Sequence, residues 1–120
     1  MQTLIMVLVL FIALEHFAFL YLEMFLWTKK TGRKIFHNTL EEAERTKVLA
    51  ANQGLYNGFL ASGLLFGLFY PDMQAGTHIT MFFLCCTFLA GLYGGFSVNK
   101  RIFFIQGLPS LVVLVVLFVG

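Results

Sequence analysis

Residues 4–27 read LIMVLVLFIALEHFAFLYLEMFLW and form the first long apolar run of the chain. About 20 such residues in a helix cross the ~30 Å hydrocarbon core of a bilayer. No basic residue precedes the run, and no small-residue cleavage site of the A-x-A type follows it, as a signal peptide would require. The segment is therefore expected to be a retained transmembrane helix.

Three further apolar segments follow, at about residues 48–70, 77–97 and 102–119. The 120 residues are 59% hydrophobic and 12% charged, about half the charge of a typical soluble domain. The apolar runs are continuous rather than alternating, which excludes a transmembrane β-barrel, and a net charge of +2 is too small for a nucleic-acid surface. The sequence predicts an all-α transmembrane four-helix bundle that forms one domain, residues 1–120.

The charges between the spans predict the orientation of the chain. Basic residues gather in residues 28–38 and 98–101, whereas the loop between them carries Asp72 and no Lys or Arg. Loops rich in Lys and Arg stay in the cytoplasm. We therefore expect a multipass protein of the cell membrane whose loops 28–38 and 98–101 are cytoplasmic and whose termini both lie on the other side.

The second span is expected to begin as a helix in water. Asn38 or Thr39 can cap this helix. Glu41 and Glu42 then lie in its first turn, where the helix dipole favours anions. The helix would enter the bilayer near Val48.

Small residues within the spans predict where helices pack closely. Lipid is as apolar as leucine, so helices in a membrane associate through close backbone approach and polar contacts. Residues with small side chains recur at four-residue spacing at Ala50, Gly54, Gly58 and Ser62, and at Gly91 and Gly95. Cys85 and Cys86 are adjacent, which suits neither a disulfide nor a metal site, and they are interpreted as packing residues. The small residues predict tight helix contacts, either within one chain or between subunits. A homo-oligomer is expected because four helices of this size make a thin bundle.

Polar side chains within the spans predict a ligand site near the cytoplasmic face. An ionisable group at membrane depth costs at least ~2.5 kcal/mol on insertion scales and therefore needs an explanation. At 1.5 Å per residue, one layer about a turn inside this face contains Glu23, Asn52, Gln53, Tyr93 and Gln106, with Tyr56 a turn deeper and Arg45 at its rim. Such a site suits an amphipathic ligand or membrane lipid. The alternative is that these groups only bond to one another.

The ionisable residues of the first span need partners. A carboxylate such as Glu23 requires a cation, and we expect Arg45 or Lys47 to supply it. Glu15 and His16 lie near mid-membrane. They are interpreted either as packing groups or as a pair that exchanges protons or binds a ligand.

Three segments carry a resemblance to a known family. They are LEMFLW at 22–27, ANQGLYNG at 51–58 and AGLYG at 90–94. These segments resemble an uncharacterised bacterial family of short four-span membrane proteins, a domain of unknown function. The resemblance covers nearly the whole chain and implies no activity.

The second span also carries a more distant resemblance. Glu44, Arg45, Asn52 and Tyr56, followed by residues 59–61, are similar to the second-helix signature of the MAPEG superfamily. Its members are four-span membrane proteins of eicosanoid and glutathione metabolism. The resemblance implies a MAPEG-like fold, a homotrimer, and a glutathione site between subunits near the cytoplasmic face.

Two functions follow from these observations. The first is a MAPEG-like binding protein or enzyme with glutathione or another thiol as a candidate cofactor, although Val48 and Leu55 stand where glutathione-binding members have Arg and Glu. The second is a non-enzymatic membrane subunit or a small proton-linked transporter in which Glu15, His16 and Glu23 relay protons or fix packing. No interrupted helix of the transporter type is expected, since Pro109 is the single proline inside the expected spans. The sequence leaves open whether the protein is an enzyme.

Overall fold

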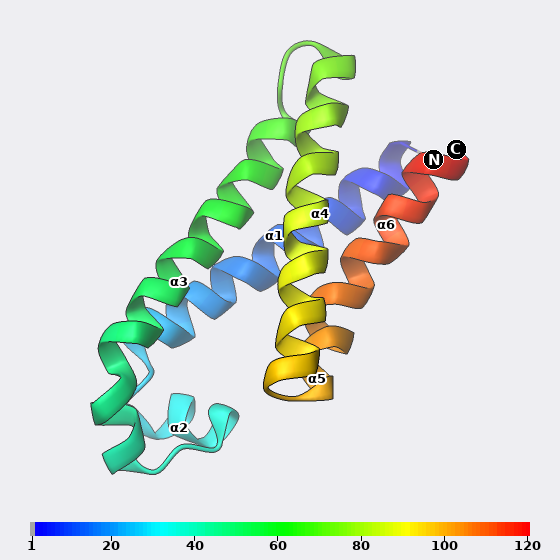
Figure 1. The fold of residues 1–120 in the computed structure, drawn as a ribbon. Helices are drawn as coiled ribbons and strands as arrows, with labels where there is room; N and C mark the ends of the chain where they lie inside the picture. Colours follow the sequence, from blue (N-terminus) through cyan, green and yellow to red (C-terminus); the bar gives the residue numbers. More distant parts are fainter. Residues whose placement is uncertain (1) are drawn as a thin grey trace. The chain divides into compact units, whose positions relative to one another are not determined.

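The computed structural model describes residues 2–120, and within this range the chain forms helices and turns with no strand (Figure 1). The helices are α1 (Gln2–Phe25), α2 (Lys30–Phe36), α3 (Leu40–Leu68), α4 (Met73–Ser97), α5 (Lys100–Ile102), a π-helical segment η1 (Phe103–Gly107) and α6 (Leu108–Val119). The all-α prediction is confirmed.

Three helical stretches are long and apolar enough to cross a membrane: α1, α4 and the continuous stretch Lys100–Val119. They support the assignment to membrane proteins. The longest helix, α3, is not in this group within residues 2–120, because charged residues fill its first turns and amides interrupt its middle. A crossing by residues 48–70, and with it the four-helix bundle, remains a prediction.

The chain divides into two compact units. One consists of the residues up to Ala13 together with Leu60–Gly120, and the other of Leu14–Phe59. Both α1 and α3 contribute residues to each unit. The prediction that residues 1–120 form a single integral membrane domain stays a prediction.

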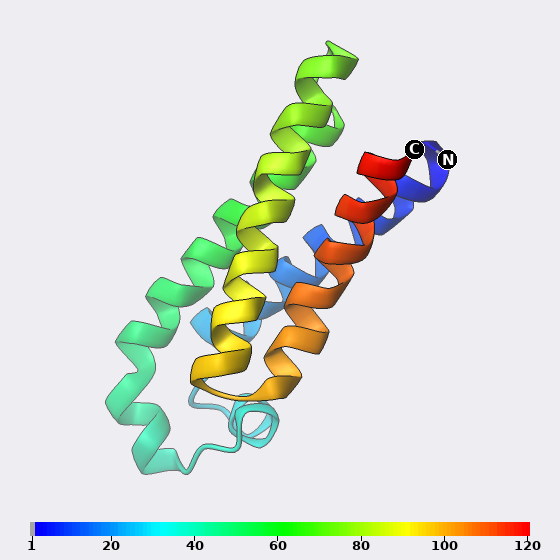
Figure 2. The same cartoon turned by 45° about the vertical axis from the view of Figure 1, so that its right-hand side comes forward.

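In the unit that contains Leu60–Gly120, α4 and α6 lie side by side (Figures 1 and 2). Close approach of α4 to η1, which leads directly into α6, depends on the absence of side chains, because a Cβ at Gly91 would lie 2.3 Å from the backbone nitrogen of Gly107. Beside this contact, the fully buried hydroxyls of Thr87 and Ser110 share a hydrogen bond. Close backbone approach and a polar pair are the contacts expected between helices in lipid.

The last helical stretch is continuous but not regular. The backbone N–H of Leu108 donates to the carbonyl of Phe103, five residues earlier, which defines a π turn. Pro109 follows directly and has no N–H to give, while the hydroxyl of Ser110 donates to the carbonyl of Gln106 at 3.3 Å. This irregularity differs from the expectation of an uninterrupted span, and the proline gives its physical reason.

In the unit Leu14–Phe59, the end of α1 packs against the first part of α3. A Cβ at Gly54 would lie 2.8 Å from Cγ of Met24, and one at Gly58 would lie 2.5 Å from Cδ1 of Leu20. Glycines therefore bring the two helices into close contact here, as the small-residue pattern predicts.

The segment between α1 and α3 contains the short helix α2, where the sequence predicted only a loop. A Cβ at Gly32 would lie 1.9 Å from the carbonyl oxygen of Leu26, so this position requires glycine. The chain then turns at His37, whose φ is 56°. Thr39 and Glu42 form a capping box: the Glu42 N–H donates to the Thr39 hydroxyl at 3.1 Å, and the Thr39 N–H donates to the Glu42 carboxylate at 3.0 Å. The bond from the Thr39 N–H, and then its hydroxyl, hold the pKa of Glu42 below its ordinary value.

Candidate ligand-binding site

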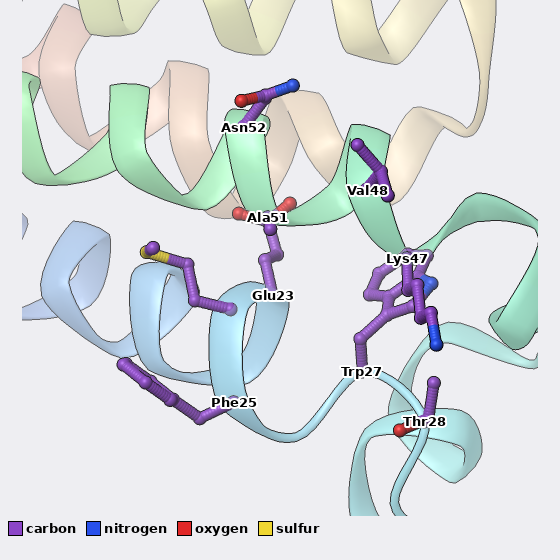
Figure 3. Close-up of a pocket in the computed structure, with 9 residues that line it drawn as sticks. Glu23, Phe25, Trp27, Thr28, Lys47, Val48, Ala51 and Asn52 are labelled. Atoms are coloured by element: carbon purple, nitrogen blue, oxygen red, sulfur yellow. The ribbon is translucent and has the colours of Figure 1, made fainter.

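A pocket of about 380 Å³ lies within the unit Leu14–Phe59, between the end of α1 and the first half of α3 (Figure 3). We call it the Glu23 pocket. It is lined by Glu23, Met24, Phe25, Trp27, Thr28, Lys47, Val48, Ala51 and Asn52. The lining combines a carboxyl group, an ammonium group, a hydroxyl and an amide with aromatic and aliphatic side chains. This mixture of an apolar wall with a few polar groups is typical of small-molecule sites.

Glu23 extends from α1 toward Ala51 on α3 (Figure 3). Its Oε1 accepts a hydrogen bond from Nδ2 of Asn57 at 2.6 Å, and Asn57 is only 7% exposed. The prediction of Arg45 or Lys47 as the partner was wrong. In residues 2–120, neither Lys nor Arg places a nitrogen within 4.0 Å of this carboxyl group.

Lys47 forms its ion pair within α3. Its Nζ lies 3.0 Å from Oε2 of Glu44, and both side chains are about half exposed. An exposed pair of this kind contributes ~0.2–1 kcal/mol. The Lys47 ammonium therefore lines the Glu23 pocket without being strongly bound by its own helix.

Trp27 is fixed at the pocket by two contacts. Its indole N–H donates to Oγ1 of Thr46 at 3.1 Å, and its ring lies against Phe36 with centroids 4.8 Å apart. The indole lies beside Lys47 (Figure 3). A ring that is held at its polar edge and on one side presents a defined surface to the pocket.

The predicted site residues of this unit divide into two groups. Glu23 and Asn52 line the pocket. Arg45, Gln53 and Tyr56 are exposed on α3 and are not part of its lining.

Two predicted site residues belong to the other unit. Tyr93 is 75% exposed on α4, and Gln106 is partly buried in η1. The expectation that all four spans share one polar layer remains a prediction.

Glu15 and His16 form a second ionisable pair in the unit Leu14–Phe59. The His16 Nδ1 lies 4.0 Å from Oε1 of Glu15, and His16 is fully buried. The imidazole also contacts Phe19 edge to face, with centroids 5.3 Å apart. This pair is not part of the Glu23 pocket lining.

Sequence reasoning missed the role of Asn57, which holds the pocket carboxylate. A signal was present, because residues 54, 57, 58 and 61 fall on one face of a helix. Asn57 therefore shares the glycine face through which α3 meets α1, whereas Asn52 lines the pocket from a direction about 140° round the helix. An amide on a close-packed face is a better candidate partner for a carboxylate of the facing helix than a lysine nearer the helix start.

A larger cavity, about 530 Å³, lies in the unit that contains Leu60–Gly120. Its lining includes Gln2, Met6, Tyr70, Met73 and Thr80, and it contains no charged side chain and none of the predicted site residues. The Glu23 pocket is smaller but carries opposite charges. For that reason it is the stronger candidate for specific recognition of a ligand.

The chemistry that the Glu23 pocket offers is binding. Its ammonium, carboxyl and amide groups can orient a polar head, and its apolar side chains can hold a hydrocarbon portion. Within residues 2–120, no group of three or more His, Cys, Asp or Glu side chains is placed to hold a metal ion.

Comparison with known proteins places the chain in a family. Residues 10–118 match the family model described as "Protein of unknown function (DUF1304)". The chain is also 38% identical over 109 residues to the uncharacterized protein YpaA of Lactococcus lactis subsp. lactis (strain IL1403), covering 89% of this chain and 90% of that protein. No solved structure matches. The resemblance to the MAPEG superfamily stays a prediction. The expected membership of an uncharacterised family is confirmed, and the chain belongs to the DUF1304 family of proteins of unknown function.

Proposed function

We propose that this membrane protein binds an amphipathic small molecule or lipid in the Glu23 pocket. The observation that carries the proposal is the Glu23 carboxyl group in the pocket wall. Among residues 2–120 it has the neutral amide of Asn57, and no cation, as its hydrogen-bonding partner. The polar head of the ligand would bond to Lys47 and Asn52, and its apolar part would lie on Phe25 and Val48.

The proposal includes a position in the membrane and an assembly. The pocket lies at the end of α1, directly before the basic segment 28–38, so the positive-inside rule favours the cytoplasmic leaflet. A MAPEG-like bundle and a homotrimer belong to the same proposal, and mass measurement in lipid nanodiscs tests the trimer. Glutathione fits less well than a lipid, because its carboxylates would meet Glu23.

Trp27 provides the test, because it is the single tryptophan of the sequence and lines the pocket. In nanodiscs, a ligand with a brominated acyl chain should quench Trp27 fluorescence saturably. Contact with bulk lipid is measured by moving the tryptophan to an exposed site, Trp27→Phe with Phe82→Trp, since Phe82 is 64% exposed. That reporter should show quenching proportional to the mole fraction of probe.

The role of the polar wall is tested with a matched pair of variants. Asn52→Ala should weaken saturable quenching several-fold, whereas Gln53→Ala, next to it and exposed, should leave it unchanged. Equal behaviour of the two Trp reporters, or equal effects of the two substitutions, would contradict ligand binding in this pocket.

Proton-linked transport is the second candidate, and one observation favours it. Nδ1 of His16 lies 4.0 Å from Oε1 of Glu15 within an apolar helix, and a His–carboxyl pair is a common proton-exchanging unit. A pH-dependent flux in proteoliposomes that His16→Ala abolishes would support transport. A flux of the same size without His16 would count against it.

A further inference from the structure

We propose that the Glu23 pocket selects a zwitterionic head group, with an ammonium at Glu23 and a phosphate at Lys47, as in an aminophospholipid. This inference rests on the proposed function and names the ligand class for the same site.

The carboxyl group of Glu23 supplies the argument for a cation. A charge at membrane depth needs an opposite charge, yet within the described residues the bonded partner is the Asn57 amide, 2.6 Å away. An ammonium from the ligand would provide that charge. Phe25 and Trp27 line the same pocket, and aromatic faces attract alkylammonium groups.

The ammonium of Lys47 supplies the argument for an anion. Its pair with Glu44 uses one of its donors and is exposed, so further N–H donors are available to a phosphate. The Lys47 amine points toward Thr28 (Figure 3), and Thr28 lines the same pocket. A lysine beside a hydroxyl is a suitable phosphate site.

The two charges together exclude simpler heads. A purely anionic head would gain Lys47 but place negative charge against Glu23, and a neutral head would offer an opposite charge to neither group. A zwitterion satisfies both groups at once. The apolar wall of Met24, Phe25 and Val48 favours a head group that carries acyl chains over the same head group in solution.

The experiment compares head groups that carry the same brominated chains. Phosphatidylethanolamine, phosphatidylcholine, phosphatidylglycerol and diacylglycerol with brominated acyl chains are titrated into nanodiscs, and saturable Trp27 quenching is measured. The zwitterionic lipids should bind about tenfold more tightly than the other two, the size of one charge-assisted contact. Soluble glycerophosphoethanolamine, added as a competitor, should displace them weakly.

Variants that remove one charge test whether Glu23 binds the ammonium and Lys47 binds the phosphate of the head group. Glu23→Gln should remove the preference for zwitterionic over anionic lipid, whereas the matched control Glu15→Gln should keep it. Lys47→Gln should weaken both phosphate-containing classes but not diacylglycerol, and Lys34→Gln is its control. If Glu23→Gln does not fold, Phe25→Leu serves in its place, because Phe25 is 60% exposed and leucine keeps the wall apolar while removing the aromatic face. This variant should lower the affinity for the zwitterionic lipids more than the affinity for phosphatidylglycerol or diacylglycerol.

The outcomes separate the two proposals. Saturable binding in which phosphatidylglycerol equals or exceeds the zwitterionic lipids overturns this inference and leaves the proposed function standing. No saturable quenching by any lipid overturns the proposed function itself. If glycerophosphoethanolamine displaces the lipid at a concentration equal to that at which the lipid itself binds, the site belongs to a soluble zwitterion. That result would overturn the proposal that the ligand is a lipid.

Discussion

Asn57→Ala should destabilise the unit Leu14–Phe59 by about 2 kcal/mol, because Asn57 holds the pocket carboxylate. Polar bonds between membrane helices average ~0.6 kcal/mol and reach ~1.7 kcal/mol, and bonds to charged groups lie at ~1.5–3 kcal/mol. The Asn57–Glu23 bond is short, at 2.6 Å, and Asn57 is 7% exposed. These features place the bond near the upper membrane value, ~1.5 kcal/mol, and lost packing of the amide adds roughly 0.5 kcal/mol.

A double-mutant cycle isolates the bond from the packing. Glu23→Ala, Asn57→Ala and the double variant should give a coupling energy of about 1.5 kcal/mol. A control cycle uses Gln53→Ala in place of Asn57→Ala, because Gln53 is exposed on the same helix. Glu23→Ala and Gln53→Ala should be additive within ~0.5 kcal/mol.

Unfolding by SDS in mixed micelles, followed by Trp27 fluorescence, measures these energies, because Trp27 belongs to the same unit. A coupling energy below ~0.5 kcal/mol would refute the reasoning. It would mean that the amide does not stabilise the carboxylate and that Glu23 finds its partner elsewhere.

Further predictions concern packing, helix capping and pH. Gly91→Ala should cost ~3 kcal/mol in SDS unfolding, because its Cβ would lie 2.3 Å from the backbone nitrogen of Gly107. At Gly94 the Cβ would instead lie 2.6 Å from the Cγ2 methyl of Ile102, a side-chain atom, so Gly94→Ala should cost less, ~1 kcal/mol. Thr39→Ala should cost ~1 kcal/mol in the same measurement through the lost cap. The pKa of Glu42 is lowered from 4.5 by its bonds to Thr39. Ionised Glu42 therefore stabilises the folded state at neutral pH, and this stabilisation is lost as the pH falls through the lowered pKa. The melting temperatures of Glu42→Gln and wild type should converge in acid. Ser110→Ala leaves the buried hydroxyl of α4 without its inter-helix partner and should lower stability by ~1 kcal/mol; an unchanged melting temperature would contradict this.

Composition and run length predicted the helical class and the apolar stretches, because the bilayer imposes both. The cap at Thr39 was also predictable, since a Thr followed three residues later by Glu is a local signal. Two features were not. Helix α2 has seven residues, too few to show a period, and it depends on the contact between Gly32 and a carbonyl in another segment. The π turn ahead of Pro109 is one of several ways in which a helix can accommodate a proline.

The site was predicted in part for a related reason. Depth along a helix follows from counting residues, so Glu23 and Asn52 could be placed near one level, and both line the pocket. The partner of Glu23 depends on which faces of α1 and α3 meet. Charge alone suggested Lys47 as the partner of Glu23. Gly54 instead packs another face of α3 against α1, and Asn57 lies on that face.

The π turn at Phe103–Gly107 has a consequence for the rotation of the last helix. A turn closed by a bond to the fifth preceding residue contains one residue more than an α turn, and each residue of a helix turns the chain by ~100°. Lys100 and Arg101 therefore point about 100° away from the direction that a regular helix would give them relative to α6. Deleting one residue between Phe103 and Gly107 would remove the extra residue and swing both basic side chains to a different side of the helix axis, while Pro109 would still lack the N–H of a regular turn.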